Sequence, residues 1–215
     1  MEFIDAIKGR QSIRAYQRQP VPKELLRDIL TTALLAPSWA NTQPWEFAIV
    51  GGKKKDELDQ VLSNNAKNMK PASPDIEMPS PNWPEPCMKR LLKLIGDMPF
   101  LKQESEHFKD MFKAWNAPNV IIIYADGALK PYALLDVGAF IQNILLTAYH
   151  YGLGTCCNFA MVRWAKEVKE CLNIPESKKL ILGITIGYPD HHSPLNERRS
   201  AKDDFDAFAV WRGFE

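Results

Sequence analysis

Hydrophobic and polar positions follow two kinds of pattern along the chain, one typical of helices and one typical of strands. Apolar residues at helical spacing predict helices over residues 2–9, 22–34, 53–65, 88–95, 104–115, 132–151 and 162–172. Short apolar or β-branched runs predict strands over residues 45–50, 120–124, 155–159 and 180–186. The two kinds of element mix without a regular strand–helix–strand alternation, so the pattern indicates an α+β fold.

A proline-rich stretch interrupts this pattern. Residues 71–86 contain six prolines, a density that we expect no regular element to tolerate. A long irregular stretch inside a compact chain is typically a functional loop or a linker. We therefore interpret residues 66–117 as a lid-like excursion from a single domain that spans residues 1–215.

The aromatic side chains of this excursion are expected to be exposed and to form one wall of a substrate pocket. The expected wall residues are Trp83, Phe100, Phe108, Phe112 and Trp115. Trp39 and Phe159 are expected on the opposite wall. A segment of this kind beside an active site selects the substrate and closes over it.

Composition and charge narrow the class of protein. The chain has 215 residues, of which 46% are hydrophobic and 25% charged, and its formal net charge is +1. These values are typical of a globular protein with a sizeable core, and they do not favour a nucleic-acid or membrane-surface partner. The longest apolar runs, such as 120–124, are too short to cross a bilayer, and residues 1–5 do not resemble a signal peptide.

The cysteines and histidines predict neither disulfides nor a metal site. The four cysteines include no Cys-x-x-Cys motif, and the four histidines lack metal-ligand spacing. A reduced, cytoplasmic chain is the natural expectation.

A basic cluster near the N-terminus is a candidate anion site. Arg10, Ser12 and Arg14 follow the first predicted helix. Two guanidinium groups and a hydroxyl suit a phosphate, although the spacing alone is equally consistent with a solvated basic helix end. The sequence contains no glycine-rich nucleotide loop, so side chains would have to hold any phosphate.

The loop between the second helix and the first strand is a second candidate. Residues 36–47 place Ser38, Asn41 and Gln43 between two prolines and beside two tryptophans. Such a loop suits a planar ligand with polar edges, while an ordinary proline-stiffened turn has the same composition.

Taken together, these motifs resemble one known family. Arg10-x-Ser12-x-Arg14, the Pro37-to-Phe47 segment, residues 136–154, Gly187-Tyr188-Pro189 and Arg198-Arg199 resemble the nitroreductase family of FMN-dependent oxidoreductases. The resemblance implies a mainly antiparallel sheet flanked by helices. It also implies an entwined homodimer in which residues 190–215 form a tail that embraces the partner.

The resemblance also implies which residues bind the cofactor. Those implied on one chain, near the phosphate, ribityl chain and ring of FMN, are Arg10, Gln11, Ser12, Arg14, Cys157, Asn158, Phe159 and Arg199. Those implied to approach the flavin from the partner subunit are Pro37, Ser38, Trp39 and Asn41, with Gln43 in contact or bracing that loop. No side chain is assigned as an obligatory acid or base.

The implied activity is ping-pong transfer of hydride from NADH or NADPH to a small aromatic acceptor, such as a nitroaromatic or a quinone. Two alternatives stay open. One is other flavin chemistry, namely reductive dehalogenation or ene reduction, and the other is a protein that stores or senses FMN. Cys156 and Cys157 are expected to be small structural side chains, with a catalytic thiol as the less favoured interpretation.

Overall fold

The computed structural model describes residues 2–77, 83–102 and 105–214. The α-helices are α1 (Phe3–Gly9), α2 (Lys23–Ala33), α3 (Gly52–Lys67), α4 (Glu85–Asp97), α5 (Ala133–His150) and α6 (Ala165–Leu172). The strands are β1 (Glu46–Gly51), β2 (Asn119–Asp126), β3 (Gly154–Asn158) and β4 (Lys178–Gly187). Short 3₁₀ helices span Trp39–Asn41, Pro99–Leu101, Glu106–Asn116, Phe159–Val162, Pro194–Asn196 and Phe205–Ala207.

The described strands form one antiparallel sheet in the order β1-β2-β4-β3. Successive residues of a strand face opposite sides of the sheet. Accordingly Ile121 and Ile123 of β2 belong to one hydrophobic cluster, and Val120 and Ile122 belong to the other. Because both faces of β2 are buried, its sequence is a continuous β-branched run rather than an alternating one.

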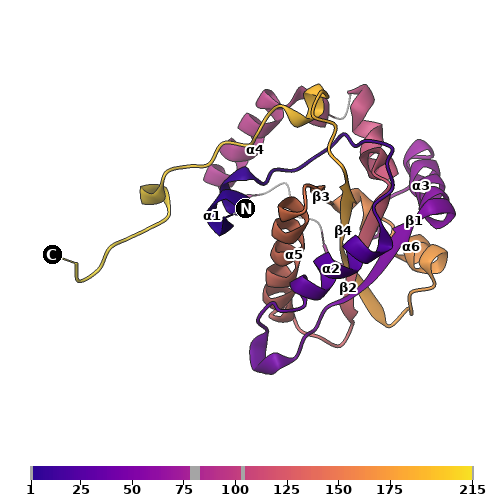
Figure 1. Ribbon diagram of the computed structural model, residues 1–215, viewed down its shortest axis with the longest axis horizontal. Coiled ribbons are helices and arrows are strands. Elements are labelled where there is room, and N and C mark those ends of the chain that lie inside the picture. The colour runs from indigo at the N-terminus through magenta and orange to yellow at the C-terminus, as the bar shows by residue number, and fades with distance from the viewer. Residues whose placement is uncertain (1, 78–82, 103–104, 215) are drawn as a thin grey trace.

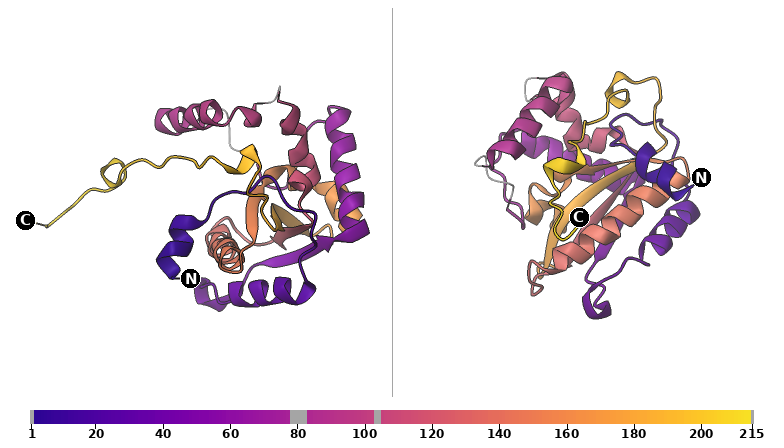
Figure 2. Two further views of the ribbon diagram at one scale, coloured as in Figure 1. Left: turned by 45° about the horizontal axis from the view of Figure 1, so that its top comes forward. Right: turned by 90° about the vertical axis from the view of Figure 1, so that its left-hand side faces the viewer.

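Helices cover both faces of the sheet, as Figures 1 and 2 show. On one face α2 and α5 pack against each other, and the Phe140 ring of α5 stacks on Trp45 with centroids 5.1 Å apart. On the other face α3 packs against α6 and the Glu106–Asn116 segment, around the fully buried Leu58 and Trp164. No helix in the described part of the chain is both long and apolar enough to cross a bilayer.

Most predicted elements are confirmed, with two corrections. Residues 104–115 do not form a regular α-helix, because the described segment is a kinked 3₁₀ helix in which Ala114 and Trp115 have positive φ. The expectation that no regular element includes Pro86 is also wrong. Pro86 lies in the first turn of α4, where its missing N–H costs little. Glu104 and residues 78–82 lie outside the described residues.

The aromatic side chains of the excursion are not all exposed. Phe112 and Trp115 are 8% and 3% exposed, which contradicts the sequence expectation for both. Phe112 packs on Trp164 with ring centroids 5.5 Å apart, so it belongs to the core of the second face. Trp83 is 37% exposed. That residues 66–117 act as a lid stays a prediction. Trp83 and α4 are now the part of this segment expected to face a substrate.

The C-terminal segment leaves the body of the protein and extends past α4 and α1 (Figure 1). Phe205, Phe208, Trp211 and Phe214 are between 62% and 75% exposed. Arg90 of α4 contacts the start of this segment, since it forms an ion pair with Asp203 at 2.7 Å and its guanidinium lies 4.9 Å from the centre of the Phe208 ring. An extended tail with this much exposed aromatic surface is typical of a segment that packs on another chain.

Candidate functional site

The segment after α1 lies along the outer edge of the sheet. The Ile13 N–H donates to the Thr155 carbonyl of β3 at 2.9 Å. Further along, the Gln17 N–H donates to the Tyr188 carbonyl at 2.9 Å, and the Asp190 N–H donates to the Ala15 carbonyl at 3.0 Å. These bonds fix residues 10–17 between β3 and the turn after β4. The sheet therefore provides a rigid support for the basic residues of this segment.

The structure brings Arg199 to this segment from the far end of the sequence. The Arg199 Nη2 donates to the Arg10 carbonyl at 2.7 Å and to the Lys8 carbonyl. Arg14 makes one long bond, from Nη1 to the Ser12 carbonyl at 3.4 Å. None of the ion pairs recorded for residues 2–77, 83–102 and 105–214 involves Arg10, Arg14 or Arg199. We call Arg10, Ser12, Arg14 and Arg199 the basic cradle.

An unpartnered polar atom lies beside the cradle. The Gln11 Nε2 donates to the Asn196 carbonyl at 2.8 Å. Its other amide atom, Oε1, is buried and has no hydrogen-bond partner among the described residues. Buried acceptors in native proteins are normally satisfied, so this atom is suited to a ligand hydroxyl. Uncompensated positive charge beside such an acceptor fits a phosphorylated polyol such as the ribityl phosphate of FMN.

The two neighbouring cysteines are not activated. Burial is the main cause that raises the pKa of Cys156, against the opposing effect of Arg14. Desolvation, followed by the neighbouring Cys156, raises the pKa of Cys157 to about 12. Both thiols are therefore protonated at neutral pH, and neither is poised as a nucleophile.

Asn158 ends β3 beside these cysteines, and Phe159 begins the 3₁₀ helix that follows. The Asn158 Oδ1 accepts from the Ala160 N–H at 3.0 Å, and its Nδ2 donates to the Met111 carbonyl at 2.7 Å. Because its side-chain amide is bonded in this way, Asn158 would contact a ligand through its backbone. Phe159 is half-buried.

The loop after α2 is held in a strained conformation. Ala40, Asn41 and Gln43 all have positive φ. This conformation costs roughly 1–2 kcal/mol for residues such as Ala40 and Gln43, while asparagine adopts it more readily. The Gln43 N–H donates to the Ser38 Oγ at 3.0 Å, and the Trp39 N–H donates to an Asp136 carboxylate oxygen at 3.2 Å. Trp39 is 70% exposed, so its ring is available to a ligand or a second chain. Strain that persists in a loop is often associated with function.

One chain does not bring the cradle and this loop together. The loop meets α5 near its N-terminus, at Asp136. Gly9, next to the cradle, packs against Tyr149 near the C-terminus of α5 so closely that a Cβ there would lie 2.0 Å from the Tyr149 hydroxyl. At 1.5 Å per residue, these two points of α5 are about 20 Å apart. In one chain, therefore, the loop that carries Pro37, Ser38, Trp39, Asn41 and Gln43 does not lie beside the cradle.

Sequence reasoning missed two residues that organise the cradle. Asn196 is 7% exposed and bonds the backbone of Arg14. Tyr16 bonds the Ile13 carbonyl and the buried Thr185 hydroxyl, both at 2.7 Å. Burial raises the pKa of Tyr16 well above its usual value, so its hydroxyl stays protonated. No sequence signal marked Asn196, because its partners in the cradle segment, Arg14 and Ala15, lie more than 180 positions away.

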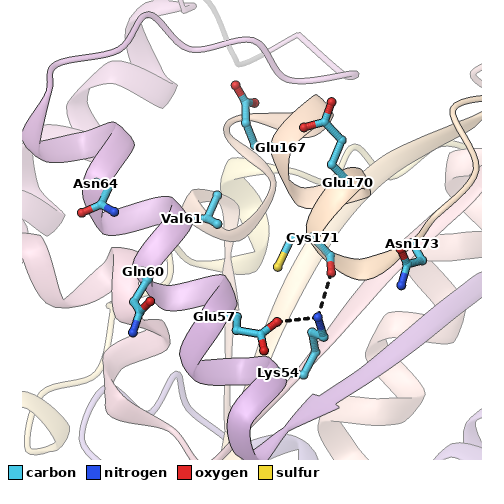
Figure 3. A pocket seen from close by; sticks show the side chains of 9 residues that line it. All are labelled: Lys54, Glu57, Gln60, Val61, Asn64, Glu167, Glu170, Cys171 and Asn173. Carbon is cyan, nitrogen blue, oxygen red and sulfur yellow. Dashed lines mark hydrogen bonds and ion pairs between the residues drawn. The ribbon is translucent and has the colours of Figure 1, made fainter.

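A separate groove lies between α3 and α6 (Figure 3), and none of the predicted site residues lines it. It has a volume of ≈580 Å³ and is lined by charged and amide side chains. Lys54 forms an ion pair with Glu57 and donates to the Cys171 carbonyl at 3.3 Å. Because Lys54 is already paired with Glu57 and bonded to the Cys171 carbonyl, the groove is a weaker candidate for an anion than the cradle.

The chain is similar to known proteins over most of its length. Residues 7–188 match the model of the nitroreductase family. The 4-nitrobenzoate reductase of Pseudomonas putida is 28% identical over 100% of this chain and 97% of its own length. The 4-nitrobenzoate reductase of Nocardioides sp. (strain LMS-CY) is 31% identical over 96% of this chain and 88% of its own length.

The fold is also that of the family. The crystal structure of the FMN and NADPH-dependent nitroreductase NfnB from Sphigopyxis sp. strain HMH has a TM-score of 0.93, with 22% identity and complete coverage of both chains. The chain therefore belongs to the nitroreductase family, and its α+β fold is nitroreductase-like.

Proposed function

We propose that the protein is an FMN-dependent oxidoreductase that uses NADH or NADPH to reduce nitroaromatics, quinones or similar acceptors. The basic cradle is the observation that carries this proposal, because it offers three arginines without carboxylate partners among the described residues. The names of the relatives agree with it, since two are 4-nitrobenzoate reductases and one fold neighbour is FMN and NADPH-dependent.

The residues of the chain fit the parts of FMN one by one. Arg10, Ser12 and Arg199 would hold the phosphate, and the free Oε1 of Gln11 would accept from the ribityl chain. Arg14 would meet the pyrimidine edge of the ring, and the end of β3 would lie along the ring through Cys157, Asn158 and Phe159. Bound FMN would supply hydride transfer from NAD(P)H to an acceptor, in a ping-pong sequence.

The protein then provides binding, charge and exclusion of water rather than an acid or base. The three arginines favour the dianionic phosphate and a negatively charged ring edge. Cys156 and Cys157 stay protonated, so they do not compete as nucleophiles.

We further propose that the working unit is a homodimer. The cradle and the loop around Trp39 are too far apart to meet in one chain, so a complete site needs both chains. Exposed apolar side chains also gather on α1, where Phe3, Ile4 and Ile7 are between 45% and 66% exposed. Together with the aromatic tail, α1 offers the apolar surface that an obligate dimer buries.

Steady-state oxidation of NAD(P)H tests the enzymatic part of the proposal. We expect oxidation to depend on an added nitroaromatic or quinone and on bound FMN. Parallel assays with halogenated aromatics and activated alkenes separate the proposed activity from dehalogenation and ene reduction. Bound FMN without turnover of any of these acceptors would contradict the proposal and favour a storage or sensing protein.

The cysteines are expected to be dispensable for turnover. Replacing Cys156 and Cys157 together by Ala should leave more than about a tenth of kcat, which is a barrier change below about 1.4 kcal/mol, because neither thiol is activated. The single variant Cys87→Ala, in α4, serves as a matched control. A double variant that binds FMN normally but has lost turnover would contradict this expectation.

The excursion is expected to select the acceptor through Trp83 rather than Phe112. Because Trp83 is partly exposed, its ring is available to an acceptor. Trp83→Ala should therefore change kcat/KM for different aromatic acceptors by unequal factors, and it should change kcat/KM for NAD(P)H less. Phe112→Ala should instead destabilise the fold by about 3–5 kcal/mol, because it empties a core position against Trp164. Equal effects of Trp83→Ala on all substrates would mean that substrate choice lies elsewhere.

A further inference from the structure

Asn196 has every hydrogen-bonding position of its side-chain amide occupied. Its Oδ1 accepts from the Arg14 N–H at 2.7 Å and from the Ala15 N–H at 3.2 Å. Its Nδ2 donates to the Ala15 carbonyl at 2.8 Å and to the Asp190 carbonyl at 2.9 Å. The side chain is almost fully buried, so water does not compete for these bonds.

Asn196 bonds Ala15 through both its donor and its acceptor, as a neighbouring strand would. The β3 contact at Ile13 fixes the segment near Ser12, but the recorded bond of the Arg14 N–H is to Asn196. Asn196 therefore sets the direction in which the backbone presents the Arg14 side chain.

The same residue also orients Gln11. The Asn196 carbonyl accepts from the Gln11 Nε2, and because an amide is planar, this bond turns the Gln11 Oε1 the other way. That oxygen is the buried atom without a partner among the described residues. Three residues further along the chain, Arg199 bonds the carbonyls of Lys8 and Arg10. Residues 196–199 thus bond the N-terminal segment at two places, at Lys8 and Arg10 and again at Arg14 and Ala15.

We propose that Asn196 is a positioning residue for the flavin phosphate and ribityl chain, an inference that rests on the proposed FMN binding. It touches no cofactor itself. It acts by holding Gln11 and the backbone of Arg14 in the arrangement that receives the ligand. Aspartate cannot replace it, because a carboxylate accepts but does not donate, and it would face the carbonyls of Ala15 and Asp190.

The test is Asn196→Asp, with Asn173→Asp as a matched control on the exposed C-terminal end of α6. FMN affinity is measured by titration of flavin-free protein, and riboflavin, which lacks the phosphate, is titrated in parallel. We expect Asn196→Asp to weaken FMN binding about ten- to a hundredfold at about pH 8, and Asn173→Asp to change it less than about twofold.

The pH dependence separates positioning from general loss of structure. Burial raises the pKa of an introduced carboxyl, and its protonated form can donate one bond. The ratio of the Asn196→Asp and wild-type dissociation constants should therefore fall as the pH is lowered from about 8 to about 5. Taking this ratio at each pH removes the titration of the FMN phosphate itself, which affects both proteins.

Hydrogen exchange of the flavin-free protein provides a readout that does not involve FMN. Asn196→Asp should speed exchange in a peptide covering residues 11–17 and leave β2 protected. Unchanged exchange, or faster exchange with unchanged FMN affinity, would overturn the inference while leaving the proposed function intact. A wild-type protein with no affinity for FMN would overturn the proposed function, and the role of Asn196 with it.

Discussion

Removal of the C-terminal tail after Ala201 is expected to dissociate the protein into monomers and to abolish most FMN binding. The tail carries four exposed aromatic side chains at positions 205, 208, 211 and 214. Burying each of them on a partner contributes about 1.5 kcal/mol or more, so together they contribute about 6 kcal/mol. That corresponds to about a 10⁴-fold change in the dimer dissociation constant. Sedimentation of both proteins at micromolar concentration measures the result.

Loss of the aromatic side chains is separated from loss of chain length by a full-length variant. Replacing Phe205, Phe208, Trp211 and Phe214 by Ser should reproduce most of the effect of truncation. Met69→Ala, a substitution of an exposed apolar residue next to α3, should leave the mass unchanged. A truncated monomer that keeps full FMN occupancy would contradict the shared-site account.

Arg10→Ala and Arg199→Ala are each expected to weaken FMN binding about ten- to a hundredfold. Each removes a charged hydrogen bond worth roughly 1.5–3 kcal/mol. The effect of Arg199→Ala should be the larger, because the variant also frees the carbonyls of Lys8 and Arg10. Titration of flavin-free protein with FMN measures both effects.

The matched control is Arg27→Ala, which removes the same charge from the exposed face of α2. It should change FMN affinity little, because exposed charges beyond about 10 Å are screened at ordinary ionic strength. Riboflavin should respond less than FMN to Arg10→Ala, since it lacks the phosphate. If Arg10→Ala and Arg199→Ala both left FMN affinity unchanged, the assignment of the cradle would be wrong.

The sheet and most helices could be predicted because their pattern is local. The β-branched run of β2 is buried on both faces, which is what a continuous apolar run indicates. The prediction of a helix over residues 104–115 was wrong, because tertiary packing rather than local sequence pattern sets the conformation of this segment. Phe112 and Trp115 both turn into the protein, and the chain adopts positive φ at Ala114 and Trp115 to allow this.

The sequence could suggest only part of the candidate site, for a similar reason. Arg10, Ser12 and Arg14 form a short motif, so spacing and family resemblance sufficed to select them. Asn196 has no such motif, because its role comes from contacts with residues that are distant in sequence. The separation of Trp39 from the cradle likewise depends on the length of α5 and on where each segment meets it.

The measurement that tests the account most directly is the absorbance spectrum of the purified, full-length protein before and after anaerobic addition of NAD(P)H. We predict the two visible bands of a bound flavin, identified as FMN after release, which bleach with NAD(P)H and return when a nitroaromatic is added. A protein that is colourless and stays so after incubation with FMN would contradict the account. So would one that releases FAD instead of FMN.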